Sequence, residues 1–161
     1  MNWIYVLDFL TEIAYLLLVF SLALCFAIFV GRQAIMNLIV GLYLALLISI
    51  EFPSYGTIFG SLSNDHAIAA AKLGFFAFIT VLTTILCYRI MPSEFREKRF
   101  ESMPKKAILA LAATILVMTF SFNVLPVTEF LTPGTPIQSL FAPEAYYFWW
   151  LLVPLVVLYF V

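Results

Sequence analysis

Residues 13–30, IAYLLLVFSLALCFAIFV, form an uncharged stretch that decides the fold class of this chain. A second uncharged stretch, AIMNLIVGLYLALLISI, follows at residues 34–50. A helix needs about 20 mostly apolar residues to cross a bilayer. Gly31, Arg32 and Gln33 separate the two stretches and suit a tight turn. The pair therefore predicts two membrane-spanning helices joined by a short connection.

The composition of the whole chain supports a membrane protein. Of its 161 residues, 65% are hydrophobic and 11% are charged. A soluble domain is about half apolar and about a quarter charged. A soluble fold of this composition would have to expose large apolar patches, which lipid covers instead. The net charge of −1 gives no basic footprint for nucleic acid.

We expect an all-α integral membrane protein, a single polytopic domain over residues 1–161 with about five transmembrane helices. Spans are predicted at residues 9–30, 34–51, 67–90, 107–128 and 145–161, with outer loops at 53–66 and 129–144 and a basic cytoplasmic segment at 92–106. Pro53 cannot continue a helix and ends the second span. The fifth span is short and contains Pro154, so a four-helix bundle with a terminal re-entrant segment is the alternative.

The basic residues predict the orientation in the bilayer. Seven of the eight lie at or between the ends of spans that share one side: Arg32, Arg89, Arg96, Lys98, Arg99, Lys105 and Lys106. Only Lys72 lies toward the other side. Because Lys and Arg are retained in the cytoplasm, the N-terminus should be outside and the C-terminus at the cytoplasmic face. We expect the cytoplasmic (inner) membrane of a prokaryote.

A polar vestibule at the outer side is the first candidate site. Its candidate residues are Asp8, Glu12, Glu51, Asp65, His66 and Lys72. Asp8 and Glu12 are four apart and share a helix face, where they could form a cation or proton site. Lys72 lies about one turn inside the third span and could pair with an acidic residue, or simply extend to the interface.

Docking and packing signals are also present. Arg96, Lys98, Arg99, Lys105 and Lys106 are a candidate surface for a soluble partner or for anionic lipid headgroups. Small residues recur every four positions in three spans, a spacing that lets helices approach closely in a bundle or an oligomer. These residues are Ala23, Ala27 and Gly31, then Ala70 and Gly74, then Ala110 and Thr114.

Catalytic chemistry has no recognisable motif here. His66 is the single histidine, and Cys25 and Cys87 stand far apart in apolar stretches. No metal-ligand spacing, nucleotide-binding loop or metalloprotease motif occurs. We therefore expect a protein that is not an enzyme and that needs no cofactor.

The first part of the chain resembles a known family. Asp8 leads into an apolar helix that ends in Gly31-Arg32, and a helix containing GLYLAL at residues 41–46 closes near Phe52-Pro53. Over roughly residues 3–55 this pattern resembles the colicin V production family of small bacterial inner-membrane proteins. The resemblance implies a non-enzymatic envelope protein linked to secretion or envelope upkeep, and it brings no catalytic residues.

Together these features predict an accessory or scaffold subunit of an envelope or secretion-related assembly. Its partners would be the bilayer, a second copy or another membrane protein. The alternative is an oligomeric channel or transporter subunit that uses Lys72 and the outer carboxylates. An intramembrane enzyme acting on lipid is a third hypothesis.

Overall fold

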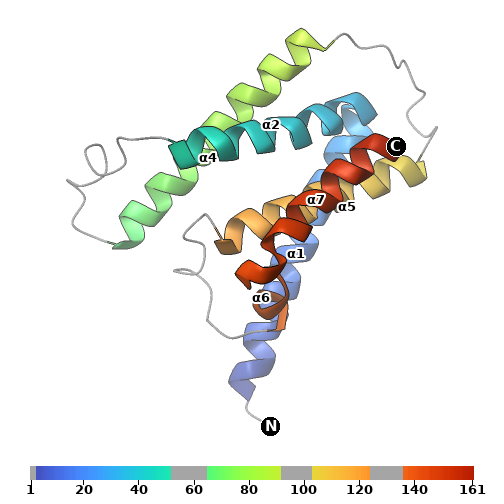
Figure 1. The fold of residues 1–161 in the computed structure, drawn as a ribbon. Coiled ribbons are helices and arrows are strands. Elements are labelled where there is room, and N and C mark those ends of the chain that lie inside the picture. Colours follow the sequence, from blue (N-terminus) through green and yellow to red (C-terminus); the bar gives the residue numbers. More distant parts are fainter. Residues whose placement is uncertain (1–2, 52–64, 92–102, 124–135) are drawn as a thin grey trace.

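The computed structural model describes residues 3–51, 65–91, 103–123 and 136–161, and this part of the chain is built from helices (Figure 1). The helices are α1 (Trp3–Phe29), α2 (Arg32–Glu51), α4 (Asp65–Ile90), α5 (Met103–Asn123), α6 (Pro136–Phe141) and α7 (Glu144–Phe160). Four of them, α1, α2, α4 and α5, are long and apolar enough to cross a membrane, and α7 is a shorter apolar helix. The predicted class, an α-helical polytopic membrane protein, is thus supported.

The first three predicted spans coincide with α1, α2 and α4, apart from an extension of α1 toward Trp3. Two boundaries differ. The fourth helix begins at Met103 rather than at residue 107, and Pro104 is acceptable there because a first-turn residue needs no backbone donor. Residues 136–141, predicted as loop, form α6, which begins at a proline for the same reason. Residues 124–128 of the predicted fourth span lie outside the described residues.

The turn between α1 and α2 depends on Gly31. Its φ of 113° lies in the left-handed region, which a residue with a Cβ rarely adopts. The Val30 amide donates to the Phe26 carbonyl at 2.9 Å, and the Ile35 amide donates to the Gly31 carbonyl at 3.4 Å. One helix thus ends and the next begins within two residues, as the sequence predicts.

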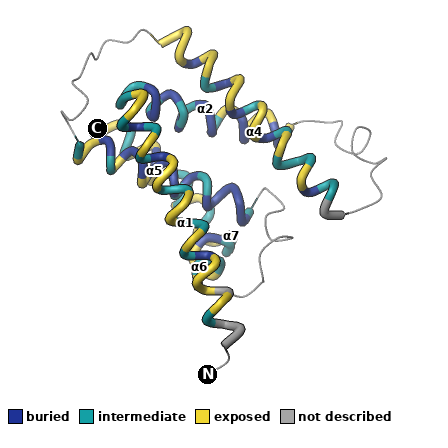
Figure 2. The backbone as a smooth tube through the Cα atoms, turned by 180° about the vertical axis from the view of Figure 1, so that it is seen from behind, coloured by how far each residue is buried: buried dark blue, intermediate teal, exposed yellow. Residues whose placement is uncertain are grey.

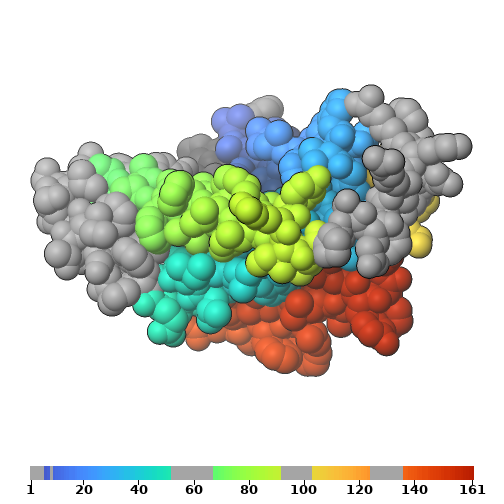
Figure 3. Space-filling model, turned by 90° about the horizontal axis from the view of Figure 1, so that it is seen from above, coloured from blue at the N-terminus to red at the C-terminus, as the bar shows by residue number. Residues whose placement is uncertain are grey.

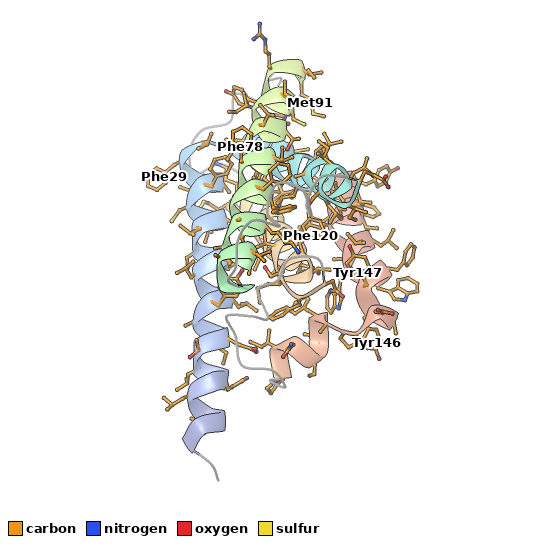
Figure 4. All side chains as sticks on the ribbon, turned by 90° about the vertical axis from the view of Figure 1, so that its left-hand side faces the viewer. Phe29, Phe78, Met91, Phe120, Tyr146 and Tyr147 are labelled. Carbon is orange, nitrogen blue, oxygen red and sulfur yellow. The ribbon has the colours of Figure 1, made fainter. Side chains whose placement is uncertain are left out.

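Helix α5 is the centre of the bundle. It packs against α1, α2, α6 and α7, and 67% of its spanning segment is buried. The corresponding share is 50% for α2, 22% for α4 and 17% for α1. Figure 2 shows the buried residues concentrated along α5 and α2. The ring of Phe120, labelled in Figure 4, lies in the interior. It meets the rings of Tyr43 and Phe76 edge-on, at centroid distances of 6.4 and 6.0 Å.

Helix α4 packs mainly on α2, beside which it lies in Figure 3. The closest approach is at Gly41, where an added Cβ would stand 2.5 Å from Thr84 Oγ1 and 3.0 Å from the Thr84 backbone nitrogen. The Thr83 hydroxyl donates to the Gly41 carbonyl at 2.9 Å. By contrast, a Cβ at Gly74 would have nothing within 4 Å. Both members of the predicted small pair, Ala70 and Gly74, are exposed.

Candidate functional site

Glu12 is the most unusual polar residue of the described structure. It lies in the candidate span Phe9–Phe29 of α1, yet its side chain is only 2% exposed. Neither carboxylate oxygen has a hydrogen-bond partner in the described structure. A buried polar group without a partner costs free energy, and an ionised one costs far more. Such a residue inside a membrane helix points to function.

The surroundings of Glu12 follow from its helix face. Tyr15 and Leu16 lie one turn further along the same face of α1. The Tyr15 hydroxyl is 3.0 Å from Ser121 Oγ of α5, and Leu16 packs with an apolar cluster that includes Phe122. Glu12 therefore lies where α1 meets the end of α5 and the short helix α6.

Two hydrogen bonds attach α6 to neighbouring helices, one from Asn123 of α5 and one from Trp150 of α7. Asn123 Nδ2 donates to the Phe141 carbonyl at 2.8 Å and to the Thr119 carbonyl at 3.0 Å. Trp150 Nε1 of α7 donates to the Leu140 carbonyl at 2.9 Å. Asn123 thus makes a hydrogen bond between α5 and α6. These bonds hold α6 against the ends of α5 and α7, beside Glu12.

The predicted outer vestibule is only partly described. Glu51 is exposed at the end of α2, and Lys72 is half-buried on α4. No hydrogen bond or ion pair joins Lys72 to Glu51 or Glu12 among the described residues. Glu12 faces α5 and α6, whereas Lys72 belongs to the helix that packs on α2, so the structure does not bring these two together. The side chains of Asp8, Asp65 and His66 lie outside what the structure describes.

The predicted basic surface needs one correction. Lys105 is exposed at the start of α5, but Lys106 is only 2% exposed. The reason is helical geometry, because Lys106 lies on the same face as the buried Leu109 and Ala110. Lys106 therefore does not belong to an exposed docking surface. Arg96, Lys98 and Arg99 lie outside the described residues.

Asn37 near the start of α2 is a second buried polar residue. It is fully buried, and its Oδ1 accepts a hydrogen bond from Gln33 Nε2 at 3.3 Å. Asn37 Nδ2 has no partner among the described atoms. The hydrogen bond that Asn37 accepts thus lies within α2.

Two adjoining hollows flank α1, with volumes of about 390 and 460 Å³. Both are lined by Phe26 and Leu38. The first extends between α1 and α4 to Thr84 and Tyr88, and the second lies against Ala113 and Val117 of α5. Their linings are almost entirely apolar, so these hollows suit hydrocarbon rather than ions.

No cluster of three or more His, Cys, Asp or Glu side chains that could hold a metal occurs within the described ranges. Cys25 and Cys87 are both free thiols. Comparison with protein-family models, with curated proteins and with solved structures finds no match for this chain. Two features of the described residues remain as candidate sites. They are the buried carboxyl of Glu12 and the exposed side of α4 that carries Gly74.

Proposed function

We propose that this chain is a non-enzymatic, multi-pass subunit that acts as an accessory or scaffold in a membrane assembly. The observation that supports this role is a stripe of small, exposed residues on α4: Ala70, Gly74 and Ala77. Small residues at this spacing let a second helix approach the backbone closely, which is a main source of helix association in membranes. Within the described chain nothing occupies this stripe at Gly74.

The position of the stripe suits a partner helix. It lies about a third of a turn from Ala69 and Phe76, which are buried on α4, and on the face that further along carries Thr84, where α4 contacts Gly41 of α2. Val81 is four residues beyond Ala77 and lines the hollow between α4 and α1. A helix on the stripe would therefore also meet the wall of this hollow. The partner that fits is an apolar transmembrane helix of a second subunit.

The proposed membrane arrangement has five spans, with the N-terminus outside and the basic residues in the cytoplasm of a prokaryotic cell. The fifth span would be α7, whose 17 residues reach about 26 Å at 1.5 Å per residue. That is slightly less than a typical hydrocarbon core, and local thinning of the bilayer can accommodate the difference. Exposed Tyr146 and Trp149 near its start suit the outer interface. The resemblance of the first part to colicin V production proteins supports a role in secretion or envelope upkeep.

The test is co-purification from the native membrane followed by native mass spectrometry. A Gly74→Leu variant should lose the partner subunit, because the larger side chain keeps its helix away from α4. Ala14→Leu is the matched control, since Ala14 is exposed on α1 outside the stripe. Retention of the same partner by both variants would reject the α4 surface. A separate variant that neutralises Arg96, Lys98, Arg99 and Lys105 tests the cytoplasmic docking surface.

An oligomeric channel or transporter subunit is the second candidate function. Glu12 favours it, because an ionisable residue inside a membrane helix often belongs to an ion or proton pathway. The assay is ion or proton flux into liposomes that contain the purified protein. A channel or transporter predicts flux that Glu12→Gln or Lys72→Leu abolishes. An absence of flux for the unaltered protein would leave the subunit role as the better account.

A further inference from the structure

We propose that the hollow between α1, α2 and α4 binds one anionic phospholipid, with an acyl chain in the hollow and the headgroup phosphate near Arg89. The inference does not rest on the proposed α4 stripe. That stripe lies in the first half of α4, whereas the hollow lies against the second half, from Thr80 to Tyr88. The inference rests on the chemistry and size of the hollow and on the charge at its end.

The hollow exists because neighbouring helices pack on different partners. Helix α1 packs mainly on α5, and α4 packs mainly on α2. Part of α2 is therefore left between α1 and α4. The hollow is lined there by Ala34 and Leu38, together with Phe26 of α1 and Ile85 of α4.

The lining offers almost no polar group to a ligand. Of its two threonines, Thr80 donates to the Phe76 carbonyl at 2.9 Å and Thr84 donates to the Thr80 carbonyl at 2.7 Å. Apart from the Tyr88 hydroxyl, the remaining side chains of the lining are hydrocarbon. A buried water needs about two to four polar partners, so this space suits a hydrocarbon chain rather than water.

The size of the hollow fits one acyl chain. Its volume is about 390 Å³. Since an apolar protein cavity of about 150 Å³ holds the six carbons of benzene, the hollow has room for about 15 carbon atoms. Thr80 and Tyr88 are eight positions apart on α4, or about 12 Å. This length is close to one leaflet of a bilayer, which is about half of a hydrocarbon core of about 30 Å.

One end of the hollow lies at the ends of the helices. Val30, Ala34 and Tyr88 line it where α1 ends, α2 begins and α4 ends. In Figure 4, Phe29 near the end of α1 and Met91 just after α4 lie toward the same end of the bundle. A lipid headgroup would therefore stand at the membrane surface while its chain lies in the hollow. In the proposed orientation this surface is the cytoplasmic one.

The charge at this end suits an anionic headgroup. Val81 and Ile85 line the hollow, and Arg89 continues the same helix face at a spacing of four residues. Arg89 is exposed, and its guanidinium matches the geometry of a phosphate. Arg32 adds a second positive charge at the start of α2, where the first turn carries no acidic residue. A basic group at the membrane surface attracts anionic lipid.

The experiment is native mass spectrometry of the full-length protein in detergent. The protein is titrated with phosphatidylglycerol or with phosphatidylcholine that has the same two acyl chains. We expect one phosphatidylglycerol to bind per chain, at lower concentration than phosphatidylcholine. Arg89→Gln should lower this preference about fivefold, the contribution of one basic residue near the surface. Lys72→Gln is the matched control, because it removes the same charge near the opposite end of α4.

Further variants test the acyl chain. Ile85→Trp fills the hollow and should abolish binding of this lipid, whereas Leu86→Trp should not, since Leu86 is exposed on α4 outside the lining. Val30→Trp fills the hollow from α1 and replaces Ile85→Trp if that variant does not fold.

Three results would overturn the proposal. The first is equal binding of the two lipids to the unaltered protein. The second is equal binding of phosphatidylglycerol to the variant with a filled hollow and to Leu86→Trp. The third is a dimer whose formation excludes the lipid, because the hollow would then be occupied by a second copy of the chain.

Discussion

Replacing Gly41 by alanine should separate α2 from α4. The new Cβ would stand 2.5 Å from Thr84 Oγ1, whereas ordinary contacts begin near 3.4 Å. Movement of the Thr84 side chain is restricted, because its hydroxyl donates to the Thr80 carbonyl at 2.7 Å and a β-branched side chain has few allowed rotamers in a helix. The Thr84 backbone nitrogen, at 3.0 Å from the new Cβ, does not rotate with the side chain.

The two helices must therefore move apart at this point, by about 0.4 Å to relieve the backbone nitrogen and by up to about 0.9 Å to relieve the hydroxyl. Overpacking of this kind costs about 1 to 3 kcal/mol. The separation also lengthens the hydrogen bond from Thr83 Oγ1 to the Gly41 carbonyl, which is 2.9 Å in the native packing. Such bonds contribute about 0.6 kcal/mol on average in membrane proteins. Gly74→Ala is the matched control, because its Cβ has nothing within 4 Å and should change stability only through helix propensity.

The assay follows the thiol of Cys87, which is buried on α4. In a Cys25→Ala background, a maleimide reacts with Cys87 only when the helix pair opens, so the rate across a denaturant series gives the free energy of opening. We expect Gly41→Ala to lower this free energy by about 1 to 3 kcal/mol relative to Gly74→Ala. Equal values for the two variants would refute the close contact at Gly41.

Three further predictions concern other contacts. Tyr43→Phe removes the hydroxyl of α2 that donates to the Leu151 carbonyl of α7 and should destabilise the protein by about 0.6 to 2 kcal/mol in detergent unfolding. In the folded protein, a lipid-soluble maleimide should label the exposed Cys25 well before the buried Cys87, and the reverse order would contradict the packing of α1 and α4. Trp150→Phe removes the bond to α6 and should increase proteolysis near residues 136–141 without changing helix content, so unchanged proteolysis would argue against this anchor.

The long helices were predictable because length and hydropathy alone decide what can cross a bilayer. The turn at Gly31 was predictable as well, since a glycine between two apolar stretches is a local signal. The choice of helix partners was not. Lipid-facing and protein-facing apolar residues have the same hydropathy, so the sequence could not show that α1 packs mainly on α5.

The packing motifs illustrate the same limit. Ala27 and Ala110 are fully buried, as their spacing predicts, but Ala70 and Gly74 with the same spacing are exposed. Close approach occurs instead at Gly41, which was not among the small residues predicted to pack. Small residues permit contact between helices, and only the partner decides whether the contact is made.

The sequence predicts which residue types belong to the candidate site, but it does not predict which of them are buried. Glu12 belonged to the expected group of outer carboxylates, and nothing in the sequence separated it from Glu51. Their difference arises from which helix face meets α5 and α6, since Glu51 is exposed and Glu12 is buried. Lys105 and Lys106 show the same effect. They are neighbours in the sequence, but a step of about 100° around α5 leaves the first exposed and the second buried.

Because α1 packs on α5, the contact between them can form only after α5 has been synthesised. Tyr15 and Ser121, whose side chains meet in the folded protein, are 106 residues apart along the chain. At about 5 to 20 residues per second, a ribosome needs roughly 5 to 20 s to add the segment between them. During this interval the side of α1 that carries Glu12 has no partner from its own chain. Until α5 enters the membrane, that side of α1 is in contact with lipid, water or the insertion machinery.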